Sequence, residues 1–297
     1  MRAQNNNKLV ERYKLRYDSN TWRELTTEPV NTLQLFITNR CNIRCKGCFY
    51  SHKLGKEEMS LEEYKDYLQK YKGKVKKVIL LGGEPTKHQN LGEMIRFNQS
   101  LELKTTIYTN GFNLEILEDI DLNDVCIRLG VYGSYSSEKP ISKIKRAKIP
   151  LEIVYMLRKN NVKELMETSR IAEREFDCKG FYISSIRDIA QTHDYWKDTN
   201  ETLSLDKYAT IIQKFIDNYT GGIKKIHLSR RGVLYTDKTD DSTNCCRFGN
   251  LFPGGEKIIC PFDISKKILS PDLVFNERQC NKNSSCLLRK IVLKRII

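Results

Sequence analysis

Three cysteines on one short stretch are the clearest chemical signal in this chain. Cys41, Cys45 and Cys48 have the spacing C-x3-C-x2-C. Three thiolates on one loop can converge on a single inorganic centre, and soft sulfur ligands suit an iron–sulfur cluster or zinc. Because the usual number of protein ligands is four, one iron of a 4Fe–4S cluster would stay open to another molecule. The alternative is a structural zinc site with His52 as its fourth ligand.

A second signal follows the next apolar run. Residues 78–81 are all aliphatic, as in a buried parallel strand, and they lead into Gly82, Gly83, Glu84 and Pro85. Glycines let the backbone approach a ligand without an intervening side chain. The carboxyl end of a strand is also where an α/β barrel binds its ligands. Two glycines and a proline alone most often form only a turn.

Together these motifs resemble the signature of the radical S-adenosylmethionine (radical SAM) superfamily. The resemblance implies that the open iron binds the amino and carboxylate groups of S-adenosylmethionine (SAM). The reduced cluster then cleaves SAM to methionine and a 5′-deoxyadenosyl radical, which abstracts a hydrogen atom from the substrate. It implies that the Gly82-Gly83-Glu84-Pro85 motif contacts the SAM amino group. It also implies an electron donor such as flavodoxin or ferredoxin, which would reduce the cluster. The cofactors carry the difficult chemistry in such an enzyme.

The resemblance extends to two further candidate SAM contacts. Many family members carry an aromatic residue just before the third cysteine, where this chain has Gly47. Its aromatic residues Phe49 and Tyr50 come immediately afterwards, and we expect them to flank the adenine. Thr109 and Asn110 begin a Thr-Asn-Gly sequence that is similar to one found at the end of the third strand in this family.

The fourth strand departs from the family pattern. Relatives with extra clusters often end this strand in Ser-x-Asp-Gly, but Gly130 and Tyr132 occupy the Ser and Asp places here. Ser134 is therefore only a fallback for the SAM-contacting serine. Arg158 follows the fifth strand, and we expect it to pair with the SAM carboxylate through charge-assisted contacts. The alternative for Arg158 is a solvated surface arginine.

The order of the expected elements is that of an α/β protein. Strand periodicity or apolar runs predict six strands, at residues 33–37, 78–81, 104–108, 125–132, 151–157 and 181–185. Helical spacing predicts helices that begin after Ser60, whose capping box is completed by Glu63, and at residues 90–101, 162–176 and 204–219. Six strand–helix units indicate a partial (β/α)6, TIM-like barrel with a small cysteine-rich C-terminal extension.

That extension holds a second set of cysteines. The patterns Cys246-x-x-Gly249 and Gly255-x4-Cys260 surround a tight turn at 252–255 that is expected to join two strands. They resemble the opening hairpin of the twitch or SPASM extension, which implies an auxiliary 4Fe–4S cluster. Cys280 and Cys286 could complete that site with Cys246 and Cys260.

Several roles of the cysteines stay open. Cys245 competes with Cys246 as a ligand, and a four-cysteine zinc knuckle or unliganded thiols are the alternatives to an auxiliary cluster. Cys126 and Cys178 lie in strand-like surroundings and are expected to be buried, inert thiols. If either reached the substrate, it could instead return a hydrogen atom to a substrate radical, as in an epimerase.

Composition sets the broader limits. The chain has 297 residues, 39% of them hydrophobic, and ten cysteines. Its first residues lack a signal-peptide core, and no apolar run is long enough to span a bilayer, so we expect a cytoplasmic protein with metal-bound cysteines. The net charge of +14 favours acidic partners. No basic–aromatic patch is clustered in the sequence, so nucleic acid is not the expected partner. The expected divisions are a lead-in (1–30), a barrel (31–200) and a C-terminal region (201–297).

The function that the sequence favours is radical modification of an unactivated C–H bond. The expected outcome is oxidation or crosslinking of a peptide, with a peptide or small molecule as the substrate and no membrane partner. The first alternative is a dehydrogenase or epimerase that acts on a sugar or a nucleotide-like metabolite. The second is a non-catalytic zinc-binding module.

Overall fold

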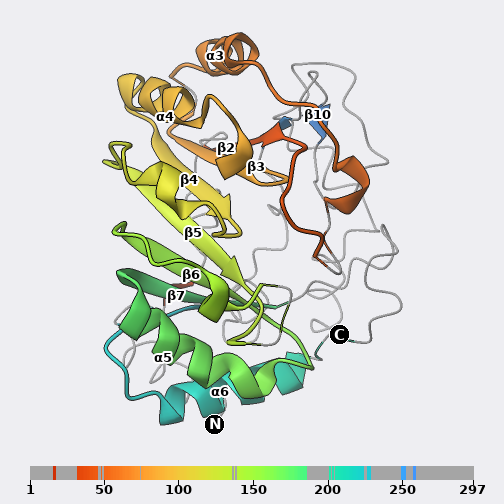
Figure 1. The fold of residues 1–297 in the computed structure, drawn as a ribbon, viewed down its shortest axis with the longest axis vertical. Helices are drawn as coiled ribbons and strands as arrows, with labels where there is room; N and C mark the ends of the chain where they lie inside the picture. The colour runs from red at the N-terminus through yellow and green to blue at the C-terminus, as the bar shows by residue number, and fades with distance from the viewer. Residues whose placement is uncertain are drawn as a thin grey trace, which may run out of the picture.

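Six parallel strands in sequence order form the centre of the computed structural model (Figure 1). The structure describes residues 16–17, 32–45, 48, 50–73, 75–135, 137, 139–185, 201, 203, 205–223, 226–228, 249–251 and 257–258. The central strands are β2 (Thr32–Thr38), β3 (Lys77–Gly82), β4 (Lys104–Thr109), β5 (Val125–Val131), β6 (Leu151–Leu157) and β7 (Cys178–Ser185). The six predicted strands are confirmed, although β7 begins at Cys178 rather than at residue 181.

Short strands extend the sheet on both edges. Beyond β7 lie β8 (Ile226–Leu228) and β1 (Arg16–Tyr17), both parallel to their neighbours. Beyond β2 lie β9 (Gly249–Leu251), parallel to β2, and β10 (Lys257–Ile258), antiparallel to β9. The predicted pair of strands around residues 252–255 is therefore confirmed. These two strands continue the sheet beyond β2.

Four α-helices pack against the sheet in the described part of the chain, and Figure 1 shows α3 and α4 toward one end of the sheet, with α5 and α6 toward the other. They are α3 (Leu61–Lys70), α4 (Leu91–Ser100), α5 (Leu165–Glu175) and α6 (Leu205–Asn218). The predicted cap of α3 is confirmed, because the Ser60 hydroxyl accepts a 3.0 Å hydrogen bond from the Glu63 amide.

Two connections differ from the expected strand–helix alternation. The segments after β4 and β5 contain only the 3-10 helices η3 (Leu114–Leu117) and η4 (Ile141–Lys143) among their described residues. The segment after β4 is short and carries several acidic residues. The second is bounded by Pro140 and Pro150, and proline removes a helical hydrogen bond and blocks the preceding turn. The fold is an α/β partial barrel that is not closed.

The two faces of the sheet differ in chemistry. Alternate strand residues, such as Leu35, Leu80, Ile107, Leu129 and Tyr155, form one apolar core with the helices. Such burial is the main source of stability for the scaffold.

The opposite, inner face of the sheet carries a polar and aromatic cluster. Arg128 pairs with Glu152 at 2.9 Å and donates a 2.6 Å hydrogen bond to the Tyr108 hydroxyl. Its guanidinium also lies over the rings of Tyr108 and Tyr182, at 5.5 and 5.6 Å.

Within the described residues, no helix is long and apolar enough to cross a membrane.

Candidate functional site

The three cysteines of the C-x3-C-x2-C motif follow β2 at the end of the sheet where β2–β7 finish, which we call the carboxyl edge. Cys41, Cys45 and Cys48 are half-buried, and none of them is in a disulfide. The loop turns back on itself, because the Cys48 amide donates a 3.2 Å hydrogen bond to the Cys45 carbonyl. Phe49 and the side chain of His52 lie outside the described residues.

The chemistry of this loop suits a sulfur-bound metal centre. Burial raises the pKa of the Cys48 thiol, the Tyr50 amide lowers it, and the nearby Cys41 raises it further; the charges of Lys139 and Arg44 oppose that rise. A bound metal would reverse this balance, since a metal deprotonates a coordinating thiol. In the described residues, no three His, Cys, Asp or Glu side chains, the three cysteines included, have the spacing of a formed metal-binding group. The donor set of three thiols on one loop fits a cluster.

The glycine pair after β3 lies directly against the cysteine loop. The Gly83 amide donates a 2.7 Å hydrogen bond to the Thr38 carbonyl, and the Glu84 amide donates one of the same length to the Arg40 carbonyl. Gly82 has φ +150°, and a Cβ there would lie 2.3 Å from the Thr38 oxygen. A Cβ on Gly83 would lie 2.2 Å from the Arg40 oxygen. Glycine is required at both positions because the two loops are in backbone contact.

Glu84 is the centre of a buried hydrogen-bond network, with only 1% of its surface exposed. One carboxylate oxygen accepts from the Thr86 amide at 3.1 Å, the Thr86 hydroxyl at 2.8 Å and the Thr109 hydroxyl at 2.7 Å. The other accepts from the Asn110 amide at 2.7 Å. Pro85 begins the short helix η2 (Pro85–Lys87) inside this network. The Glu84 side chain thus joins the turns after β3 and β4.

Asn110 connects the turn after β4 to the cysteine loop. Its side-chain amide donates a 2.7 Å hydrogen bond to the Asn42 oxygen and lies 3.9 Å from the Cys41 sulfur. Its side-chain oxygen accepts from the Phe112 amide at 3.0 Å. Three motifs that are far apart in sequence therefore meet at one place on the carboxyl edge. Their roles as SAM ligands stay a prediction.

Tyr50 is placed beneath the cysteine loop. It is 2% exposed, and its ring stacks on Phe36 with centroids 5.0 Å apart and planes 11° apart. Its hydroxyl donates a 2.6 Å hydrogen bond to the Asn39 side chain. In this arrangement Tyr50 packs against β2 and supports the start of the loop. Its contact with an adenine stays a prediction.

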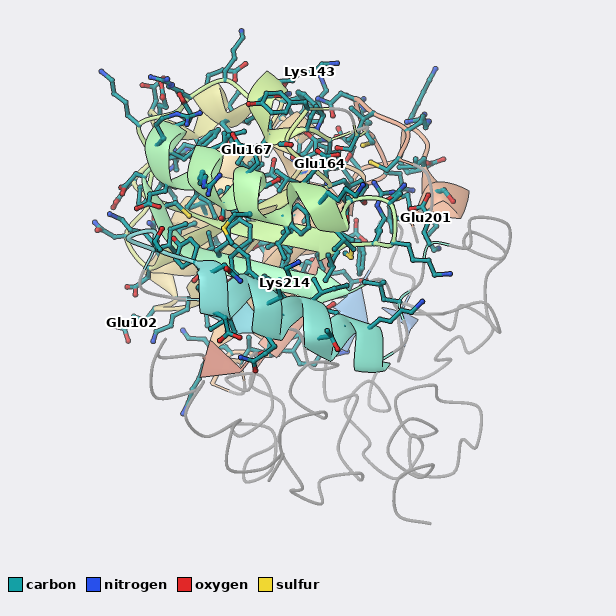
Figure 2. The ribbon with its side chains drawn as sticks, turned by 90° about the horizontal axis from the view of Figure 1, so that it is seen from below. Glu102, Lys143, Glu164, Glu167, Glu201 and Lys214 are labelled. Atoms are coloured by element: carbon teal, nitrogen blue, oxygen red, sulfur yellow. The ribbon has the colours of Figure 1, made fainter. Side chains whose placement is uncertain are left out.

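Ser134 donates to a carboxylate of the protein itself. Its amide and hydroxyl lie 2.6 and 2.8 Å from one Glu164 oxygen, which also accepts from the Tyr135 amide at 3.3 Å. Glu164 ends the 3-10 helix η5 (Val162–Glu164) and precedes α5. Figure 2 shows Glu164 beside the first turn of α5, with Glu201 toward the same side of the molecule. The serine is thus bound to Glu164 in this structure.

Arg158 is buried, with 2% of its side chain exposed, so the alternative of a solvated surface arginine is wrong. It forms an ion pair with Glu201 at 3.1 Å, and Glu201 is itself 9% exposed. Its guanidinium lies 4.6 Å from the ring centroid of Tyr132. The predicted pairing of Arg158 with a SAM carboxylate would compete with this internal partner.

Lys139 also lies close to these residues, although no sequence motif marked it. Its ammonium is 4.8 Å from the ring centroid of Tyr132, the same ring that Arg158 contacts. It is also one of the charges that act on the Cys48 thiol. A possible signal was the glycine at position 130, which leaves space that another side chain can fill. The auxiliary-cluster candidates Cys246, Cys260, Cys280 and Cys286, together with Cys245, lie outside the described residues.

Comparison with known proteins identifies related chains. The family model described as the radical SAM superfamily matches residues 35–183. The GTP 3′,8-cyclase of Aquifex aeolicus (strain VF5) is 23% identical over 197 residues, which are 62% of this chain and 58% of that protein. The chain therefore spans little more than half the length of this curated relative.

Two solved structures share the fold. SuiB of Streptococcus suis, bound to its precursor peptide SuiA, has a TM-score of 0.68 at 16% identity, with 97% of this chain and 74% of that chain covered. The enzyme anSMEcpe, with bound AdoMet and the Cp18Cys peptide, has a TM-score of 0.59 at 16% identity, with 90% and 83% covered. At these identities the similarity establishes a common fold.

Proposed function

Because this chain belongs to the radical SAM superfamily, we propose that it is an enzyme that uses SAM to modify an unactivated C–H bond of a peptide. The expected product is an oxidised or crosslinked peptide. Cys41, Cys45 and Cys48 would hold the 4Fe–4S cluster as thiolate ligands. When bound, the reduced cluster and SAM together supply a carbon radical that can remove a hydrogen atom from an unreactive carbon.

One observation carries this proposal: the cysteine loop, the Gly82-Gly83-Glu84-Pro85 turn and the Thr109-Asn110 turn meet at the carboxyl edge. Direct hydrogen bonds join the three segments, from Gly83 to Thr38, from Asn110 to Glu84 and from Asn110 to Asn42. Glycines at 82 and 83 keep side chains out of the contact. A small molecule bound to the cysteine loop would therefore face backbone groups and polar side chains that are already held in place.

The choice of a peptide substrate has weaker support. Both solved structures described above are named for a bound peptide, and the described residues share their fold. A barrel that is not closed also leaves a lateral entrance for a large substrate. An external one-electron donor such as flavodoxin or ferredoxin would reduce the cluster.

A nucleotide-like metabolite is the second candidate substrate. The observation that favours it is the relationship to the GTP 3′,8-cyclase of Aquifex aeolicus, which covers 62% of this chain. The net charge of +14 agrees with an anionic substrate. Under this alternative the enzyme would be a dehydrogenase or epimerase of a sugar or nucleotide, or would rearrange a nucleotide.

We also propose an auxiliary 4Fe–4S cluster held by Cys246, Cys260, Cys280 and Cys286. Supporting this, β9 and β10 form an antiparallel pair between the first two of these cysteines. Cys246 precedes β9 by three positions and Cys260 follows β10 by two. An antiparallel pair brings the residues before its first strand and after its second strand to the same end. A twitch-type extension with one cluster accounts for this number of cysteines better than a two-cluster SPASM set.

The test begins with metal content after anaerobic purification and reconstitution. Iron, sulfide and zinc are measured in the wild type and in the triple Cys41→Ala, Cys45→Ala, Cys48→Ala variant. Formation of 5′-deoxyadenosine from SAM is measured under a strong reductant. We expect about eight irons per wild-type chain and about four in the variant, with SAM cleavage by the wild type alone.

Other outcomes separate the parts of the proposal. About four irons in the wild type would remove the auxiliary cluster but keep the SAM-cleaving enzyme. Stoichiometric zinc without iron or cleavage would contradict the proposal and favour a zinc-binding module. Substrate class is tested by supplying a candidate precursor peptide or GTP, each deuterated at carbon. Deuterium in 5′-deoxyadenosine from the peptide alone supports the first candidate, and from GTP alone the second.

A further inference from the structure

The ring of Tyr132, just past the end of β5, contacts two cations whose electrostatic surroundings differ. Arg158 lies 4.6 Å from the ring centroid, and its charge is balanced by Glu201 at 3.1 Å. Lys139 lies 4.8 Å from the same centroid. None of the ion pairs in the described part of the chain includes Lys139. Only one of the two cations therefore has a carboxylate partner among the described residues.

The Lys139 ammonium occupies the space of a side chain at position 130. A Cβ built on Gly130 would lie 2.9 Å from the Lys139 nitrogen and 3.7 Å from the Thr109 carbonyl oxygen. The ammonium therefore lies over the end of β5, next to the end of β4. Asn110 follows Thr109 there and contacts the cysteine loop.

The charge at this position would be stabilised by an anion. Lys139 is half-buried, and a partly desolvated ammonium is stabilised when it pairs with an opposite charge. A ligand that binds beside the cysteine loop and carries a carboxylate would supply the missing anion. Under the proposed function, SAM has such a group in its methionine portion.

We propose that Lys139, rather than Arg158, binds the carboxylate of SAM. This inference rests on the proposed function and replaces Arg158, which the sequence had suggested as the partner of the carboxylate, with Lys139. An ammonium–carboxylate contact of this kind is a charge-assisted hydrogen bond, which is among the stronger polar contacts in proteins. The Arg158–Glu201 pair then has a structural role, in which it holds Tyr132 and the segment before α6 against the sheet.

The experiment crosses a protein change with a ligand change. Equilibrium dissociation constants are measured on anaerobically reconstituted protein for SAM and for decarboxylated SAM, which keeps the amine and the adenosine but lacks the carboxylate. For Lys139→Met we expect affinity for SAM to fall about tenfold or more, as for loss of a hydrogen bond between charged groups. Affinity for decarboxylated SAM should stay at the wild-type value.

A second variant moves Lys139 without removing it. In Gly130→Val the branched side chain would occupy the position of the ammonium, and valine suits a strand. Because the displaced group is the end of a flexible side chain, the fold should tolerate the change. We expect the same selective loss of SAM affinity. Lys143→Met is the matched control, since Lys143 is an exposed lysine on the same connection, and both affinities should be unchanged.

The outcomes distinguish the inference from the function on which it rests. Equal losses for SAM and decarboxylated SAM in Lys139→Met, or no loss for either, would overturn the role of Lys139. A selective loss in Arg158→Met but not in Lys139→Met would assign the carboxylate to Arg158 instead, and would also overturn it. If wild-type protein that contains iron binds neither ligand, the proposed function itself fails, and the inference fails with it.

Discussion

The Glu84 carboxylate accepts a 2.7 Å hydrogen bond from the backbone amide of Asn110, 26 positions later in the chain. Glu84 follows β3 and Asn110 follows β4, so this bond joins the ends of two adjacent parallel strands. Both residues also contact the cysteine loop, through the Arg40 carbonyl and the Asn42 side chain. The position of the loop therefore depends on a buried carboxylate that need not itself touch a ligand.

Replacing this carboxylate with an amide should destabilise the protein. In Glu84→Gln one oxygen becomes an N–H donor that faces donors of Thr86, Thr109 or Asn110. We expect the free energy of unfolding to fall by about 1–3 kcal/mol, the cost of leaving a buried polar group unsatisfied. Urea denaturation measures this, with the exposed Glu115→Gln as the control. Equal midpoints for the two variants would show that the network does not stabilise the fold.

The close contact at Gly83 predicts a loss of metal binding on substitution. In Gly83→Ala the new methyl group would clash with the Arg40 carbonyl, so the cysteine loop must shift. We expect iron per chain after reconstitution to fall to about half of the wild-type value, because only an auxiliary cluster would remain. The control is Gly92→Ala in α4, where the nearest atom would be 3.5 Å away and alanine favours the helix. Wild-type iron content in Gly83→Ala would contradict the prediction.

The buried ion pair of Arg158 and Glu201 should matter more than an exposed one. Arg158→Met leaves a carboxylate without its partner in a site where it is 9% exposed, and we expect destabilisation of about 3–5 kcal/mol. Arg170→Met removes an exposed pair with Glu167 and should cost about 1 kcal/mol or less. Denaturation midpoints of the two variants measure the difference, and similar midpoints would show that the Arg158–Glu201 pair is not stabilising.

Two thiols, Cys126 and Cys178, predict a loss of stability at alkaline pH; they are half-buried rather than fully buried as expected from the sequence. Burial raises the pKa of both Cys126 and Cys178 from 9.0 to about 11, with a further rise at Cys126 from the charge of Glu152. Between those values the folded chain keeps protons that the unfolded chain releases, so the free energy of unfolding falls as the pH rises. Urea midpoints from pH 8 to 11 should therefore decline less steeply in Cys126→Ala than in the wild type. Parallel declines would exclude a contribution from Cys126.

The strands were predictable because alternating or continuous apolar residues set which face each strand buries. Residues 151–157 were predicted with the bounds observed for β6. β7 was placed three residues too late, because Cys178, Lys179 and Gly180 have no apolar pattern and are strand only through pairing with β6. The connections after β4 and β5 were wrongly expected to contain α-helices. Strand–helix alternation was assumed there, although the local sequence did not support a helix.

The site was predictable to the level of motifs but not of partners. The cysteines and the two turns carry family patterns in residues that are close in sequence. The contacts of Ser134 with Glu164, and of Arg158 with Glu201, join residues 30 and 43 positions apart and depend on how β5, β6 and the start of α6 are arranged. Lys139 carries no motif, and its position became visible only from the space above Gly130.

The pairing of β9 with β2 has a consequence for attempts to shorten the chain. β2 is rich in aliphatic residues, and on one edge it is hydrogen-bonded to β9 from the C-terminal region. A fragment truncated after β7 would leave that edge bare, and an exposed apolar strand edge is a template for self-association. The domain boundary suggested by sequence near residue 200 is thus a poor place to cut. The strand that leads into the cysteine loop is shielded by the part of the chain that such a cut would discard.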